Sequence, residues 1–161
     1  MAATRVLMVC MGNICRSPTA EGVLRHKLQA AGLAAQVEVA SAGTHGYHTS
    51  EPPDPRAIKH AAARGYDLSR QRARRVAKED FERFDWVLAM DRDNLEWLQD
   101  MAPEGSRARV GLLLSHAPEL GLHEVPDPYY GAPAGFDRVL DLVEHACDGF
   151  IATLKRESGT S

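Results

Sequence analysis

The feature that most constrains this chain is an apolar run that leads into a short polar loop near the N-terminus. Residues 6–9 are all apolar and predict a buried β-strand. Residues 10–17, Cys-Met-Gly-Asn-Ile-Cys-Arg-Ser, follow directly. Pro18 then suits the first turn of a helix that continues to Leu28 through apolar residues at helical spacing. The loop is therefore predicted to be a strand-to-helix turn.

A turn of this kind is suited to binding an anion. The N-terminus of a helix has unsatisfied backbone N–H groups and the positive end of the helix dipole. Gly12 can adopt a positive φ, and Asn13 tolerates one better than most residues, so the amides of Met11 to Ser17 can point at one phosphate. The loop lacks the Gly-Lys-Ser/Thr of a Walker loop. We therefore expect a phosphate site with a different chemistry.

A thiol and an arginine stand at the two ends of this loop. Cys10 and Arg16 bracket five residues, so both can meet one phosphate in a loop curled around it. The arginine fork can hold two phosphate oxygens, and the positive field favours thiolate over thiol at Cys10. Ser17 could donate a hydrogen bond to that thiolate or to the departing sulfur. A lone cysteine is more often a buried hydrophobe, but this combination of residues in one turn favours a nucleophile.

Length and composition place limits on the rest. A chain of 161 residues predicts a single domain, here residues 4–157, followed by a loose tail at 158–161. With 44% hydrophobic residues and neither a long apolar run nor a signal peptide, we expect a cytoplasmic protein that does not insert into membranes. The net charge of −3 argues against nucleic acid as a partner. Three cysteines without metal-ligand spacing predict neither a disulfide framework nor a metal site, and Cys147 is predicted to fill the core.

Predicted strands and helices alternate along the chain. Later strands are expected at residues 37–40, 85–89 and 109–113, and later helices at 54–65, 91–98 and from Val139 to Leu154. Trp86 and Trp97 are expected in the core. This alternation predicts an α/β fold, a three-layer sandwich with a central four-stranded parallel sheet and helices on both faces. The phosphate-binding loop follows the first strand, at the carboxyl edge where such sheets bind ligands.

The segment Val9–Glu21, VCMGNICRSPTAE, resembles the active-site loop of the low-molecular-weight protein tyrosine phosphatases. Residues 41–44, 53–57 and 127–131 resemble other segments of that family in the same order, and the resemblance covers about residues 5–155. It implies hydrolysis of phosphotyrosine through a phosphocysteine, with Cys10 as nucleophile and Arg16 as phosphate clamp. It also implies that no metal or organic cofactor takes part.

The leaving oxygen in such a reaction needs a proton donor, and Asp127 is the candidate. It lies in Val-Pro-Asp-Pro-Tyr-Tyr-Gly, residues 125–131, where two prolines stiffen the backbone. From the residues alone, an Asp-Pro turn without function is an equally good interpretation. The resemblance identifies Asp127 as the general acid, and as the base for the water that hydrolyses the phosphocysteine.

The substrate wall should be aromatic, because a phosphotyrosine ring is flat and apolar. Tyr47, Tyr129 and Tyr130 lie on loops that flank the motifs, and a surface position is the alternative for Tyr130. Related arginine phosphatases tend to carry threonine where this chain has Ile14, which favours tyrosine substrates. The residues expected to contact substrate are Met11, Gly12, Asn13, Ile14, Cys15, Ser17, Tyr47, Tyr129 and Tyr130.

Other residues are expected to support the site. By resemblance, Asn13 and Ser41 hold the loop through hydrogen bonds, and Asp91 is a further supporting residue. Many family members carry a histidine where this chain has Gln71, which can still donate and accept. The basic run at residues 70–75 could recruit an acidic partner, but a solvated face is the more common explanation.

Cys15 is five residues from Cys10 in the same loop. On oxidation it could trap the sulfenic acid of Cys10 as a disulfide, which would protect the nucleophile. The alternative is a small residue that only packs. The resemblance favours the protective interpretation.

Three other functions compete with tyrosine phosphatase. A protein arginine phosphatase would use the same loop. A thiol-linked arsenate reductase would need a relay of further cysteines, and only Cys147 is available outside the loop. A phosphate-binding module would not need nucleophile, arginine and acid together. The expected partner is a tyrosine-phosphorylated protein, which could be a cognate tyrosine kinase, and the Arg- and Ala-rich composition suggests a bacterial source.

Overall fold

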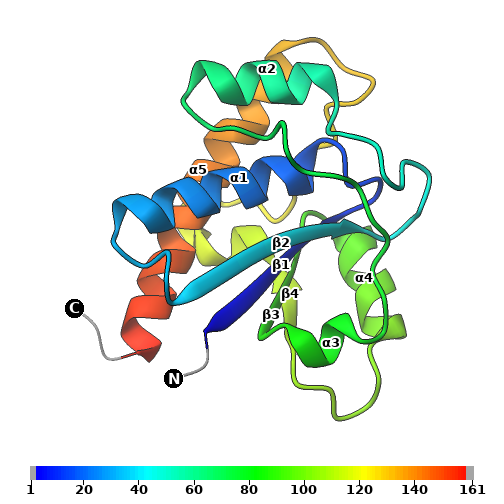
Figure 1. Cartoon of the computed structure of the whole chain (residues 1–161), viewed down its shortest axis with the longest axis vertical. Coiled ribbons are helices and arrows are strands. Elements are labelled where there is room, and N and C mark those ends of the chain that lie inside the picture. Colours follow the sequence, from blue (N-terminus) through cyan, green and yellow to red (C-terminus); the bar gives the residue numbers. More distant parts are fainter. Residues whose placement is uncertain (1–2, 159–161) are drawn as a thin grey trace.

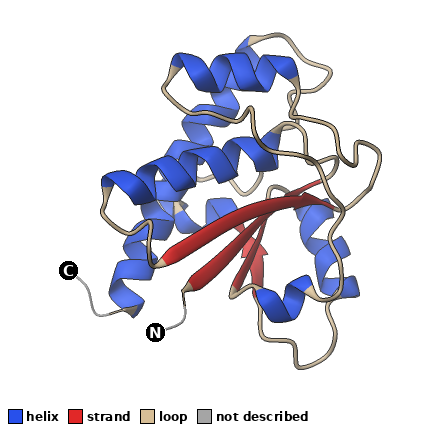
Figure 2. Ribbon diagram, viewed as in Figure 1, coloured by secondary structure: helices blue, strands red, loops and turns tan. Residues whose placement is uncertain are grey.

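The computed structural model describes residues 3–158, which form an α/β sandwich around one parallel sheet (Figures 1 and 2). The four strands are β1 (Thr4–Cys10), β2 (Val37–Gly43), β3 (Trp86–Ala89) and β4 (Arg109–Leu112), in the order β2-β1-β3-β4. Each pairs with its neighbours in parallel. This confirms the predicted four-stranded sheet.

Helices cover both faces of the sheet. The elements on the two faces are α1 (Arg16–Ala30), α2 (Pro55–Ala63), α3 (Asp80–Arg83), α4 (Arg92–Met101) and α5 (Ala134–Glu157), with short 3₁₀ turns η1 (Leu113–His116) and η2 (Pro118–Leu120). In Figure 1, α1, α2 and α5 lie on one side of the sheet and α3 and α4 on the other. The predicted three-layer arrangement is therefore confirmed.

The central strand β1 explains why this sheet is covered twice. Val6 and Met8 belong to the core under α1 and α5, whereas Leu7 and Val9 belong to the core on the α4 side. Successive side chains of a strand point to opposite faces, so a continuous apolar run requires packing on both. All four residues are fully buried.

Several element boundaries differ from the predictions for local reasons. Strand β4 ends at Leu112 because η1 begins at the next residue. Helix α1 begins at Arg16, two residues before the predicted proline. Asp54 and Asp91 precede α2 and α4 as N-caps, each accepting a hydrogen bond from a backbone N–H in the first turn. Helix α3, a single turn, and the two 3₁₀ turns carry no periodic signal and were not predicted.

The predictions of core residues are confirmed in part. Trp86 and Cys147 are buried as predicted. Trp97 is only half-buried: it packs against the α4-side core, and the Arg75 guanidinium lies 5.9 Å from its ring centroid. The prediction of a core Trp97 was therefore wrong, because helix α4 presents this ring at the edge of its apolar stripe.

The described helices and strands run from Thr4 to Glu157. Residues 159–161 of the predicted tail lie outside the described residues. Within the described part, no helix combines the length and the apolar character needed to cross a membrane.

Candidate active site

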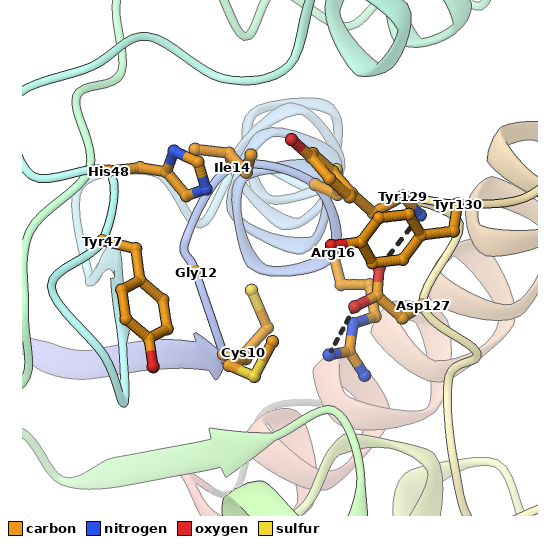
Figure 3. A pocket seen from close by; sticks show the side chains of 11 residues that line it. Cys10, Gly12, Ile14, Arg16, Tyr47, His48, Asp127, Tyr129 and Tyr130 are labelled. Carbon is orange, nitrogen blue, oxygen red and sulfur yellow. Dashed lines mark hydrogen bonds and ion pairs between the residues drawn. The ribbon is translucent and has the colours of Figure 1, made fainter.

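A cavity of about 340 Å³ opens where β1 gives way to α1, at the carboxyl edge of the sheet. It is lined by residues of the anion loop (residues 10–16), of the 47–48 segment and of the acid loop (residues 126–133). In Figure 3, Tyr47 and His48 stand on one side of Cys10, and Asp127, Tyr129 and Tyr130 on the other. The structure thus brings together the sequence motifs that lie furthest apart in the chain.

The anion loop presents its carbonyl groups to the surrounding protein. The carbonyls of Cys10, Met11 and Ile14 accept hydrogen bonds from the N–H groups of residues 44, 45 and 54. The backbone N–H groups of residues 11–15, in contrast, find no acceptor among the described residues. A Cβ at Gly43 would lie 2.7 Å from the carbonyl oxygen of Met11, so only glycine allows this close packing. The loop is left with a set of free amide donors, which is what an anion requires.

Asn13 holds the loop in its curled form. Its φ of 59° lies in the left-handed region, which asparagine tolerates better than other residues with a side chain. The backbone N–H of Arg74 donates to Oδ1 of Asn13 at 3.1 Å, and this fixes the orientation of the amide. Nδ2 therefore donates to Oγ of Ser17 at 2.8 Å and to Oγ of Ser41 at 3.0 Å.

These bonds determine which way the serine hydroxyls point. Ser41 accepts from Asn13 and donates to Oε1 of Glu21 at 2.7 Å. Ser17 accepts from Asn13, so its own proton is free for Sγ of Cys10, 3.0 Å away. The alternative acceptor for Ser17 is the carbonyl of Ala42, at a longer 3.5 Å. Two branches of hydrogen bonds thus start at the amide of Asn13: one runs through Ser17 to the sulfur of Cys10, and the other runs through Ser41 to Glu21.

The end of the Ser41 branch was not predicted. Glu21 is buried, and its Oε2 accepts a hydrogen bond from Arg25, one helical turn further along α1. Gln71 is more peripheral: its Nε2 donates to the carbonyl of Pro18 at 2.9 Å, and its Oε1 lies 3.5 Å from Oγ of Ser41. The resemblance of the Ser-Pro-Thr-Ala-Glu segment to the family's loop does not by itself predict a role for its glutamate.

Arg16 forms the floor of the cavity. Its side chain is 4% exposed, and one terminal nitrogen donates to Oδ2 of Asp91 at 2.6 Å and to the carbonyl of Val125 at 3.1 Å. The other terminal nitrogen lies 3.7 Å from Oδ2 of Asp127 (Figure 3). Burial opposes the charged form, but Cys10 and the hydrogen-bonded Asp91 outweigh it and raise the pKa of Arg16. The guanidinium is therefore charged and held in one orientation.

The acid loop carries Asp127 over the cavity. Oδ1 of Asp127 accepts a hydrogen bond from the N–H of Tyr129 at 3.0 Å. Tyr129 is half-buried, whereas Tyr130 is 94% and Tyr47 is 72% exposed. All three tyrosines border the cavity, so an aromatic wall is present at its mouth.

The two cysteines of the loop differ in environment. Both are buried and free, and both line the cavity. Burial, reinforced by the nearby Asp54 carboxylate, raises the pKa of the Cys15 thiol well above its usual value. Cys15 is thus kept protonated at neutral pH, whereas the hydroxyl of Ser17 faces the sulfur of Cys10.

The loop residues predicted to contact substrate occupy two kinds of position. Met11, Gly12, Ile14 and Cys15 line the cavity, while the side chains of Asn13 and Ser17 lie buried behind the loop. His48 also lines the cavity and was missed; its Nδ1 lies 2.6 Å from Oε2 of Glu51. No sequence signal distinguished His48 from the other histidines of the chain.

Several arginines of the basic run at residues 70–75 have partners within the protein. Arg74 makes a two-pronged ion pair with the buried Asp80, and Arg72 donates to backbone carbonyls. Arg75 lies over the ring of Trp97. At least part of this run therefore stabilises the fold.

Comparisons with known proteins agree with this geometry. The family model for low molecular weight phosphotyrosine protein phosphatase matches residues 5–160. A low molecular weight protein-tyrosine-phosphatase from Streptomyces coelicolor is 44% identical over 156 residues, which are 95% of this chain and 94% of that protein.

Solved structures are similar as well. A protein tyrosine phosphatase from Entamoeba histolytica, with Hepes in its active site, superposes with a TM-score of 0.91 at 39% identity over 98% of this chain and 99% of its own. An arginine phosphatase from Drosophila superposes with a TM-score of 0.88 at 29% identity, over 93% and 97% of the two chains. The chain belongs to the low molecular weight phosphotyrosine protein phosphatase family.

Proposed function

We propose that this protein hydrolyses phosphotyrosine in proteins through a phosphocysteine intermediate. The observation that carries the proposal is the convergence on one cavity of Cys10, Arg16 and Asp127. The free N–H groups of residues 11–15 lie in the same loop as the thiol. A nucleophile, fixed donors for a phosphoryl group and a proton donor are the three parts that this reaction needs.

The first step transfers the phosphoryl group to sulfur. The Cys10 thiolate attacks phosphorus, an S–P bond forms, and the bond between phosphorus and the phenolic oxygen breaks. Asp127, in its protonated form, gives its proton to that oxygen as the phenol leaves. Arg16 and the loop amides stabilise the charge on the equatorial oxygens, because they are fixed in place before the reaction.

The second step regenerates the enzyme. Asp127, now a carboxylate, takes a proton from water, and the water oxygen attacks phosphorus. The S–P bond breaks, inorganic phosphate leaves, and the electron pair returns to the sulfur of Cys10. The hydroxyl of Ser17, 3.0 Å from that sulfur, stabilises the departing thiolate.

Tyrosine is favoured over arginine as the substrate by the side chain of Ile14. This apolar residue is only 8% exposed, and it lines the cavity together with the tyrosines. An aromatic ring gains from apolar contact there, whereas a guanidinium group would lose hydrogen bonds to water. Arginine phosphatase is retained as the second candidate because a protein of that name superposes closely.

Arsenate reduction finds less support. A thiol relay needs a further cysteine that can reach the cavity. Cys147 is fully buried in α5 and does not line the cavity, and burial raises the pKa of its thiol. This cysteine is suited to packing.

The test is phosphate release from matched phosphotyrosine, phosphoserine and phosphoarginine peptides, with thiol and a chelator present. We expect release from phosphotyrosine, none from phosphoserine, and complete loss in Cys10→Ser. Preference for phosphoarginine would overturn the weight given to Ile14 but keep the mechanism. Absence of release from all three would overturn the proposal.

We further propose that Cys15 protects Cys10 by forming a disulfide with its sulfenic acid. Cys15 lies in the same loop and borders the same cavity. After peroxide treatment, thiol should restore activity in the parent and much less in Cys15→Ser. Equal recovery in both proteins would contradict this role.

The proposed partner is a tyrosine-phosphorylated protein, a class that includes autophosphorylated tyrosine kinases. The cytoplasm is its proposed location. The exposed rings of Tyr47 and Tyr130 provide contact area for a protein chain around the phosphorylated residue.

A further inference from the structure

A second connection joins the anion loop to the acid loop, independent of Arg16. It starts at Asp54, which is buried at the N-terminus of α2. The backbone N–H of Asp54 donates to the carbonyl of Ile14 at 2.8 Å. Asp54 is therefore attached directly to the loop that carries the nucleophile.

The carboxylate of Asp54 in turn holds Arg56. Nε of Arg56 lies 3.0 Å from Oδ1 and a terminal nitrogen lies 2.8 Å from Oδ2, which is the two-pronged geometry of a strong arginine–carboxylate pair. These hydrogen bonds lower the pKa of Asp54, so the pair is charged at neutral pH. This pair fixes Nε and one terminal nitrogen of the guanidinium.

From that position Arg56 reaches the acid loop. A terminal nitrogen donates to the carbonyl of Tyr129 at 3.0 Å. The guanidinium also lies 5.6 Å from the ring centroid of Tyr129 and 4.8 Å from that of Phe136, at the start of α5. Cation–π contacts of this kind orient an arginine whose charge is already paired.

The contact with Tyr129 bears directly on Asp127. The N–H of Tyr129 donates to Oδ1 of Asp127 at 3.0 Å (Figure 3). The carbonyl of the same residue is held by Arg56. Among the described residues, Arg56 is the only side chain outside the loop that hydrogen-bonds to residues 126–133. The other outside donors are the backbone N–H groups of Gly135 and Phe136, which bond to the end of the loop, away from Asp127. Arg16 approaches the carboxylate itself, and Arg56 holds the backbone that carries it.

We propose that Arg56 is a positioning residue that holds Asp127 in register with the anion loop. This inference rests on the proposed phosphatase function and assigns to α2 a part in proton transfer. The path runs from Ile14 through Asp54 and Arg56 to Tyr129, and the 3.7 Å approach of Arg16 to Asp127 closes the ring. Proton donation falls off steeply when donor and acceptor are misplaced, so a loosened loop should affect only steps that need the acid.

The experiment compares Arg56→Met with Arg64→Met. Arg64, at the C-terminal end of the same helix, bridges α2 to α5 through Asp141 and Glu144 but does not contact the acid loop. Each protein is assayed for kcat/KM with p-nitrophenyl phosphate, whose leaving group needs little protonation, and with phenyl phosphate, whose leaving group needs much.

In Arg56→Met we expect kcat/KM for phenyl phosphate to fall by about 10- to 100-fold, part of the range that general acid catalysis provides. For p-nitrophenyl phosphate the fall should stay below about 3-fold, because its first step depends little on the acid. Phosphate binding by Arg56→Met should match the parent. The kcat/KM values of Arg64→Met for the two esters should also match the parent.

Equal losses for the two esters in Arg56→Met, or the same selective loss in Arg64→Met, would overturn the proposal while leaving the phosphatase function intact. If the parent released phosphate from neither ester, the proposed function would fail and this inference with it. Should Arg56→Met not fold, Arg56→Lys tests the same point. A single ammonium cannot hold both Asp54 and Tyr129, but it can still hold one of them. The selective loss of kcat/KM for phenyl phosphate should therefore be smaller in Arg56→Lys than in Arg56→Met. Equal losses for the two esters in Arg56→Lys would again overturn the proposal.

Discussion

The anion loop and the acid loop face each other across the cavity, and the protein holds them with very different firmness. The anion loop is tied at both ends and in the middle: its carbonyls are bonded to the β2–α2 segment, and Asn13 is held by Arg74 and two serines. The acid loop is mostly exposed, and one outside side chain, Arg56, hydrogen-bonds to it.

This difference follows from what each loop must recognise. A phosphoryl group has the same shape and charge in every substrate, so rigid donors can be fixed in advance and lose nothing on binding. The leaving group carries a protein chain that must enter and depart, and a lightly held loop allows that movement. The comparison predicts that damage to the anion loop affects all substrates alike, while damage to the acid loop depends on the leaving group.

The largest effect should come from Arg16→Lys. The guanidinium fork is replaced by a single ammonium that cannot satisfy Asp91, Val125 and the phosphoryl oxygens together. We expect kcat/KM to fall by about 10³-fold, comparable with the loss of a fixed oxyanion donor. The loss should be the same for p-nitrophenyl and phenyl phosphate. A strong dependence on leaving group would show that the two loops do not act separately.

Asp127→Asn should come next and should show the opposite pattern. The amide has almost the size of the carboxyl group but cannot donate a proton to the leaving oxygen. We expect kcat/KM for phenyl phosphate to fall by about 10²-fold or more, with a much smaller loss for p-nitrophenyl phosphate. The plot of rate against leaving-group acidity should become steeper than in the parent. An unchanged slope would contradict the assignment of Asp127 as general acid.

A smaller effect is expected at Asn13, where two substitutions separate backbone from side chain. Asn13→Gly permits the φ of 59° but removes the bonds to Ser17 and Ser41; Asn13→Ala removes the bonds and adds strain of about 1 kcal/mol. Both variants should lose about 10-fold in kcat, because a hydrogen bond that orders the loop is typically worth about 1 kcal/mol or more. The melting temperature should be lower in Asn13→Ala than in Asn13→Gly, because only alanine is strained at this φ. Equal melting temperatures would mean that the loop geometry is not strained.

The smallest effect is expected for Glu21→Gln, at the end of the hydrogen-bonded branch that runs from Asn13 through Ser41. A glutamine amide can donate to Ser41, which would let that hydroxyl turn and would loosen its bond with Asn13, the residue that also holds Ser17. We expect kcat/KM to fall by about 3-fold, equivalent to part of one hydrogen bond. The loss should be the same for p-nitrophenyl and phenyl phosphate, because Glu21 acts on the anion loop and not on Asp127. Glu96→Gln, an exposed change on α4, serves as control. An unchanged kcat/KM in Glu21→Gln would show that the branch through Ser41 does not help to order the loop.

The sequence predictions were accurate where the interactions are local, and they failed where the interactions join distant residues. The strand, turn and helix around Cys10 were predicted within two residues, since periodicity and turn chemistry are local signals. Trp97 was misplaced because amphipathic spacing does not say how far around a helix the core extends. His48 and Glu21 went unassigned because no local pattern marks a histidine or glutamate as part of a network.

The sequence by itself determined that a thiol and an arginine would bracket a helix N-terminus, because seven consecutive residues contain the whole arrangement. It also determined that the sheet would be covered on both faces. Only the tertiary structure decided which groups surround that loop. Asp91 and Val125 meet Arg16 from 75 and 109 residues away, and Arg56 meets Tyr129 across 73 residues. Contacts of such range depend on how the helices pack on the sheet, and no local rule of spacing specifies them.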